Sequence, residues 1–106
     1  MILHIVSCSA WEAARTAGTY RAESLDSEGF IHFSRWSQLA ATAARYYAGV
    51  SDLVVLVVDE TALDDLRVEL SPSTGETLPH LYGPLPVGAV VDVMPLEDAL
   101  ARAAAG

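Results

Sequence analysis

The feature that most constrains the fold is an unbroken apolar run near the middle of the chain, Leu53 to Val58. Six consecutive apolar residues, four of them valine, are typical of a central strand that is buried on both faces. The run is far shorter than the roughly 20 residues that span a bilayer. It therefore predicts the core strand of a soluble domain and no membrane segment.

The other elements follow from apolar periodicity and from capping signals. Ser9 and Glu12 fit a capping box at the start of a helix, and Ser34 is expected to cap the longest helix. Three prolines between Pro79 and Pro86 predict a rigid and irregular segment. Strands are predicted over residues 2–6, 30–33, 66–70 and 89–94, and helices over residues 10–17, 35–48 and 96–104. This order predicts one compact α+β domain over residues 1–106, with a bent mixed or antiparallel sheet and about three helices.

Charge and cysteine content limit the partners and the compartment. The 106 residues carry a formal net charge of −8, and all six cations are arginines. Nucleic acid is therefore not expected as a partner, since a phosphate-binding surface needs clustered positive charge. The single cysteine, Cys8, cannot form an intramolecular disulfide, and the amino terminus lacks the basic region of a secretory signal. We expect a cytoplasmic protein that does not bind membranes, and a monomer or weak homodimer.

Two short segments combine an imidazole with a hydroxyl and are the first candidates for a site. In the first, His32 and Ser34 share one side of a predicted strand, and Arg35 follows where a helix N-terminus could bind a small anion. In the second, His80 and Tyr82 lie among the prolines, a common setting for a binding wall. The alternatives are that Ser34 only caps a helix and that both histidines only satisfy internal hydrogen bonds.

His4 and Glu69 complete the set of candidates. His4 lies on the first predicted strand, where a lone histidine is more often a core residue than a ligand. Three histidines match the ligand count of a catalytic zinc site, but their wide spacing does not predict a metal site. Glu69 projects from the exposed face of its strand and could act as a base or orient a ribose hydroxyl, although exposed carboxylates usually serve only solvation.

Together these motifs resemble the small bacterial family known as domain-of-unknown-function family 952. The resemblance covers nearly the whole chain. It rests on an opening strand with His4, on Gly29-Phe30-Ile31-His32 with Ser34, on Leu66-Arg67-Val68-Glu69, and on Pro79-His80-Leu81-Tyr82. The family is regarded as a compact relative of the ADP-ribosyltransferase fold, a split and bent sheet that binds NAD in its cleft.

By this resemblance, His4 and His32 would orient the nicotinamide ribose, and Ser34 and Arg35 would receive phosphate. Glu69 would stabilise positive charge at the ribose carbon, and His80 and Tyr82 would close the cleft. The chain departs from the well-studied transferases, because the tyrosine and glutamate motifs of those enzymes are not reproduced cleanly. The resemblance therefore implies an NAD-binding transferase or a degenerate form of one. A binding module for another nucleotide or an acidic metabolite, and a structural or interaction domain, remain as alternatives.

Overall fold

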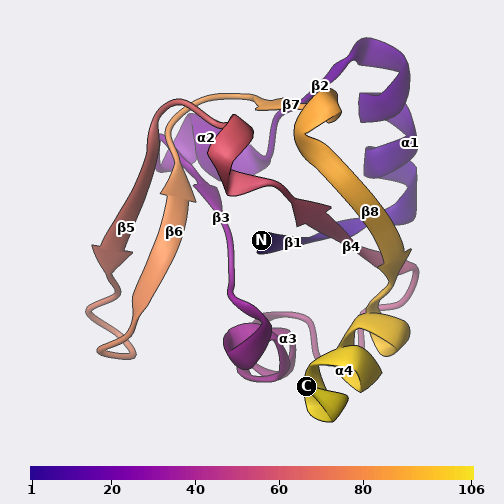
Figure 1. Ribbon diagram of the computed structural model, residues 1–106, viewed down its shortest axis with the longest axis vertical. Helices are drawn as coiled ribbons and strands as arrows, with labels where there is room; N and C mark the ends of the chain where they lie inside the picture. Colours follow the sequence, from indigo (N-terminus) through magenta and orange to yellow (C-terminus); the bar gives the residue numbers. More distant parts are fainter.

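The apolar run forms strand β4 (Leu53–Val58), the centre of one of three antiparallel sheets in the computed structural model, which describes residues 1–106 (Figure 1). Its neighbours are β1 (Ile2–Ser7) and β8 (Val90–Pro95), so the sheet has the order β1-β4-β8. Five of the six residues of β4 are buried. The prediction of a central buried strand is confirmed.

A second sheet has the order β3-β6-β5, with β3 at Ile31–His32, β6 at Thr77–Leu81 and β5 at Leu66–Leu70. A third sheet pairs β2 (Thr19–Tyr20) with β7 (Leu85–Pro86). The first two sheets are joined directly after β3, where Leu3 and Ser34 exchange two backbone hydrogen bonds of 2.8 Å. All strand pairs are antiparallel, which agrees with one of the two expected arrangements, but the strands form three sheets and not a single bent one.

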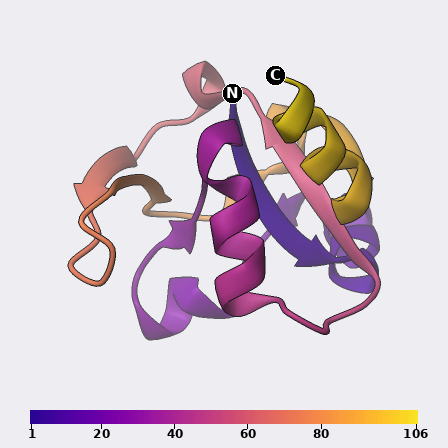
Figure 2. The same ribbon diagram turned by 90° about the horizontal axis from the view of Figure 1, so that it is seen from below.

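Helices cover the sheets on two sides. The α-helices are α1 (Cys8–Ala17), α2 (Glu23–Ser27), α3 (Leu39–Tyr46) and α4 (Leu96–Ala105), and short 3₁₀ turns occupy Trp36–Gln38, Glu60–Ala62 and Val87–Ala89. Figure 2 shows α3 and α4 against the same side of the β1-β4 pair. The domain is therefore α+β with three main helices, as expected. None of its helices has the length and apolar character that crossing a bilayer requires.

The first sheet buries both of its faces, which creates two hydrophobic cores. Alternate residues of β1 and β4 face α3 and α4, where Leu39, Ala43 and Ala99 complete one core. The remaining residues face α1 and the second sheet, where Trp11 and Phe33 belong to the other core. Side chains that alternate along a strand point to opposite faces, so one strand pair supports both cores.

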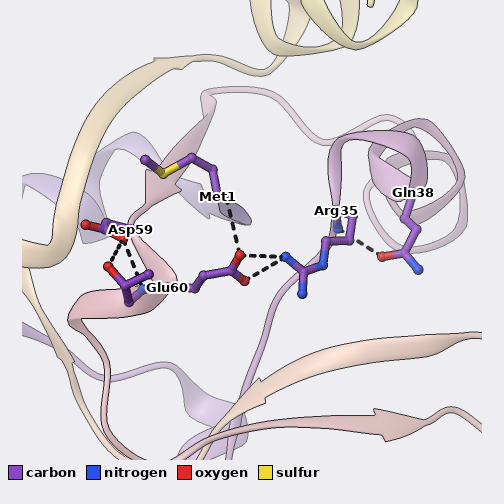
Figure 3. A network of polar contacts seen from close by, with 6 residues as sticks. Met1, Arg35, Gln38, Asp59 and Glu60 are labelled. Atoms are coloured by element: carbon purple, nitrogen blue, oxygen red, sulfur yellow. Dashed lines mark hydrogen bonds and ion pairs between the residues drawn. The ribbon is translucent and has the colours of Figure 1, made fainter.

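Two expected helix starts are wrong. Helix α1 begins two residues earlier than predicted, because the hydroxyl of Ser7, and not of Ser9, accepts the N–H of Ala10 at 3.2 Å. Ser34 does not cap a helix, since its backbone bonds Leu3 in the bridge between the sheets. The turn that leads into α3 is closed instead by Gln38, whose Oε1 accepts the Arg35 N–H at 2.9 Å (Figure 3).

The proline-rich segment is also more regular than predicted, because its first part is β6, the central strand of the second sheet. Proline lacks a backbone N–H and normally avoids central strands. Here the carbonyl of Pro79 still accepts the Phe33 N–H at 3.0 Å, and the missing donor falls just beyond the end of β3. A central strand therefore tolerates Pro79 because its β3 neighbour has already ended.

Candidate functional site

The outer face of the second sheet gathers most of the candidate residues. His32 and Arg67 are both directly opposite His80 in the strand register, so the three side chains share one face. Alternation along each strand adds further residues to that face, while Ile31 and Leu81 point into the core. We call this surface the histidine face; it consists of Phe30, His32, Arg67, Glu69, His80 and Tyr82.

Glu69 is the acceptor around which the histidine face is arranged. Its Oε1 accepts two hydrogen bonds, from His80 Nδ1 at 2.9 Å and from the Tyr82 hydroxyl at 2.5 Å. These bonds, that of Tyr82 first, hold the pKa of Glu69 below its usual value, so the carboxylate is ionised at neutral pH. The same contact raises the pKa of Tyr82. Oε2 of Glu69 has no partner within the protein, and it can accept a bond from a ligand.

His80 is held by a stacked aromatic ring and one hydrogen bond, and its second ring nitrogen has no partner in the protein. Only 8% of the residue is exposed, because Phe30 stacks on its ring at 4.0 Å between centroids and an angle of 25°. Nδ1 donates to Glu69, whereas Nε2 has no protein partner. No buried side-chain nitrogen or oxygen lacks a hydrogen bond, so Nε2 of His80 is open to solvent. This nitrogen can donate a proton to a ligand or accept one from it.

A second imidazole–carboxylate pair lies beside the first. His32 Nε2 is 2.8 Å from Glu28 Oε2, and the rings of His32 and His80 are 5.4 Å apart at nearly right angles. Phe30 packs its ring against both histidines, at 4.7 Å from His32. The histidine face therefore presents two adjacent groups of acid–base character around one aromatic ring.

Arg67 supplies the positive charge of the histidine face. Its guanidinium carbon lies 4.1 Å from the centre of the Tyr82 ring, a cation–π geometry. None of the ion pairs in the structure includes Arg67, and the residue is exposed. An anionic ligand on this face would find an unpaired guanidinium there.

His4 lies behind this face and is occupied at both nitrogens. Nδ1 donates to the carbonyl of His32 at 2.7 Å, and Nε2, left unprotonated, accepts the Tyr20 hydroxyl at 3.0 Å. Burial lowers the pKa of His4 to about 4 and raises that of Tyr20 to about 12. His4 is therefore neutral, and its ring fixes the backbone of His32 from inside the core.

Ser34 and Arg35 lie apart from the cluster. The hydroxyl of Ser34 is buried and 3.1 Å from that of Thr42. The Arg35 guanidinium bonds both oxygens of Glu60, at 2.6 and 3.0 Å, and Glu60 also meets the amino group of Met1 at 3.5 Å (Figure 3). The cation expected for phosphate is thus paired with a carboxylate.

The sequence did not single out Glu28, Arg67 or Tyr20, and it left Phe30 without a role. The signal for Arg67 was present, since it lies two residues from Glu69 on the same strand face. Glu28 and Tyr20 come from a segment expected to be irregular, so no pattern placed them. A shallow pocket lies beside the histidine face, and its lining includes Asp65, Tyr82 and Pro84. No three histidine, cysteine, aspartate or glutamate side chains are grouped as a metal site would require.

Comparison with known proteins places the chain in a family. The X-ray structure of protein CC0527 from Caulobacter crescentus is similar to this chain. The two share 35% identity with a TM-score of 0.84, and the match covers 94% of this chain and 97% of that one. The solution NMR structure of the same protein matches with 36% identity and a TM-score of 0.75, covering 89% of this chain and 82% of that one. No functionally curated protein matches the chain. A family model matches residues 5–93, and the chain belongs to the family described as "Protein of unknown function (DUF952)".

Proposed function

We propose that the histidine face binds a dinucleotide of the NAD type and supports transfer of its ADP-ribosyl group to an acceptor. The observation that carries this proposal is the Glu69 carboxylate, which is ionised, held by two donors and left with one free oxygen. A fixed negative charge stabilises the positive charge that develops on a ribose carbon as its glycosidic bond breaks. Fixing the carboxylate in advance removes the cost of orienting it during the reaction.

The neighbouring groups fit the other parts of such a ligand. Arg67 is the unpaired cation and suits the pyrophosphate, the role that the sequence had given to Arg35. His32 suits the ribose hydroxyls, which leaves Nε2 of His80 for the acceptor. In the reaction, the bond between ribose C1′ and nicotinamide N1 breaks, and nicotinamide leaves with the electron pair. The acceptor nucleophile bonds C1′ and gives its proton to Nε2 of His80.

The openness of the face supports a second candidate, a module that binds a nucleotide or another acidic metabolite without cleaving it. The Glu69 side chain is 36% exposed, so water has access to the group that would stabilise the reacting carbon. Enzymes usually exclude water from such a centre. Binding needs only Arg67, the hydrogen-bonding groups and the aromatic rings, all of which are in place.

Thermal unfolding with NAD tests binding, and nicotinamide release tests the reaction. NAD at a hundredfold excess over its Kd would add about 2.7 kcal/mol and raise the midpoint by on the order of 10 °C. Arg67→Ala should abolish most of that shift, whereas Arg15→Ala, an exposed arginine on α1, should leave it unchanged. No shift at millimolar NAD would contradict the proposal, and a shift without release over hours would favour the binding module. In an active enzyme, Glu69→Gln should lower nicotinamide release more strongly than NAD affinity.

A further inference from the structure

The outer edge of β5 is a free strand edge that lacks the usual protection against pairing. β5 bonds β6 on one side only, and it lies at the periphery of the molecule in both views (Figures 1 and 2). Strand edges are commonly blocked by proline, by a bulge or by lysine. β8, the edge of the first sheet, has a register shift opposite Val57 and Val58 and ends at Pro95. β5 reads Leu-Arg-Val-Glu-Leu in regular register and has no proline, bulge or lysine. Its two charged residues, Arg67 and Glu69, have opposite signs, so they do not repel a second copy of the strand.

The hydrogen bonds next to β5 show which backbone groups point outward. Tyr82 donates to the carbonyl of Asp65 at 3.0 Å, and Ser71 donates to that of Glu76 at 2.7 Å, both in the register of β5 with β6. Bonded and non-bonded positions alternate along an antiparallel pair. The odd-numbered residues of β5 therefore turn their N–H and C=O groups toward β6, and Val68 presents both of its groups to solvent.

We propose that β5 pairs in antiparallel orientation with β5 of a second copy of this chain, with Val68 opposite Val68 of the second copy. In that register the two valines exchange both of their outward hydrogen bonds. A twofold axis relates the copies, as in most homodimers. The two β3-β6-β5 sheets then form one sheet of six strands.

The side chains of β5 are complementary to themselves in this register. Arg67 stands opposite Glu69 of the second copy, and Glu69 stands opposite its Arg67, so opposite charges meet twice. On the other face, Leu66 stands opposite Leu70 of the second copy. The dimer therefore covers Val68 and Leu70, which are 56% and 64% exposed in the single chain. A shift of the register by one residue would place both arginines and both glutamates opposite apolar side chains.

The dimer also engages two side chains of the histidine face, Arg67 and Glu69, so pairing competes with the ligand proposed above for these two groups. Arg67 of the second copy comes to lie beside Glu69, the carboxylate that His80 and Tyr82 hold. Each histidine face would then have two guanidinium groups beside it, one from its own chain and one from the second copy. This consequence does not depend on which ligand the face binds, so the pairing can be tested without one.

Sedimentation equilibrium over a range of concentrations tests the pairing. Each copy has a net charge of −8, so the measurement is made at about 0.15 M salt to screen the overall repulsion. The wild-type chain should show a monomer–dimer equilibrium, and Val68→Lys should raise its Kd at least about tenfold, because two ammonium groups would face each other. The control is Val91→Lys on β8, where a valine of 55% exposure should be replaceable without effect. A wild-type chain that stays monomeric throughout, or a dimer that survives Val68→Lys, overturns the proposal.

A charge exchange tests the register itself. Arg67→Glu places glutamates opposite each other, and Glu69→Arg places arginines opposite each other, so each variant alone should be monomeric. A mixture of the two restores both opposite-charge pairs and should form a heterodimer with the Kd of the wild-type protein to within a few fold. A mixture that stays monomeric while the wild-type protein dimerises would refute the register with Val68 at the axis.

Discussion

His4 and His80 differ in how many of their ring nitrogens have a partner in the protein, and this difference decides what each imidazole can do. His4 has a partner at each nitrogen and is sealed in the core, so its ring is kept neutral. His80 is almost as buried, but only one of its nitrogens has a partner in the protein. An imidazole with both nitrogens occupied is a structural crosslink, whereas one with a free nitrogen can still exchange a proton with a ligand.

The buried His4 makes stability depend on pH. The pKa of His4 is about 4 in the folded chain and 6.5 for an ordinary histidine, the value expected in the unfolded chain. Below pH 6.5 the unfolded chain therefore binds the proton more readily than the folded chain does. The free energy of unfolding is therefore highest above pH 6.5, falls as pH is lowered through that value, and levels off near pH 4. Chemical denaturation should show that His4 accounts for a loss of about 2 kcal/mol between pH 7.5 and pH 5.

The variant His4→Gln separates this contribution from that of the carboxylates. Its amide can donate to the His32 carbonyl but does not titrate, so the loss between the two pH values should shrink by about 2 kcal/mol. An unchanged loss in His4→Gln would show that another group is responsible.

Among the elements, helix α1 shows how one side chain sets a boundary. Ser9 and Glu12 predicted a capping box with Ser9 as the N-cap. The structure uses Ser7 because β1 continues to that residue, which leaves its backbone extended as an N-cap requires. Ser9 is already inside the helix.

Substituting each serine distinguishes the two boundaries. Ser7→Ala should lower the free energy of unfolding by about 1 kcal/mol, because the Ala10 N–H loses its acceptor. Ser9→Ala should cost less or even stabilise the helix, since alanine has the higher helix propensity. Urea denaturation of the two variants provides the measurement, and a larger loss for Ser9→Ala would contradict the assigned boundary.

At the scale of the whole molecule, the two cores share the β1-β4 pair and should unfold together. Trp11 belongs to the core under α1, and Trp36 packs against the core under α3 and α4. Each tryptophan therefore reports on one core. Because the same two strands carry both cores, neither core can lose its sheet while the other stays intact.

A core substitution tests this coupling. Leu56→Ala removes a fully buried side chain from the Trp11 core and should cost about 3 kcal/mol. Leu56→Ala is combined with Trp11→Phe or with Trp36→Phe, so that each protein keeps one tryptophan as its fluorescent reporter. Leu56→Ala should lower the unfolding midpoint by the same amount with either reporter. Midpoints that separate when Leu56 is truncated would show that the cores unfold independently.

The sequence alone determined the elements whose signals are local. The run Leu53–Val58 predicted a central strand, and the alternation in Leu66–Leu70 placed Arg67 and Glu69 on one face of a strand. Only the tertiary structure decided which of these elements meet. The strand register set His32 opposite His80, and burial decided that His4 is neutral while Arg35 is paired with Glu60. Pairing between distant strands depends on packing across the whole domain, and no short stretch of sequence contains that information.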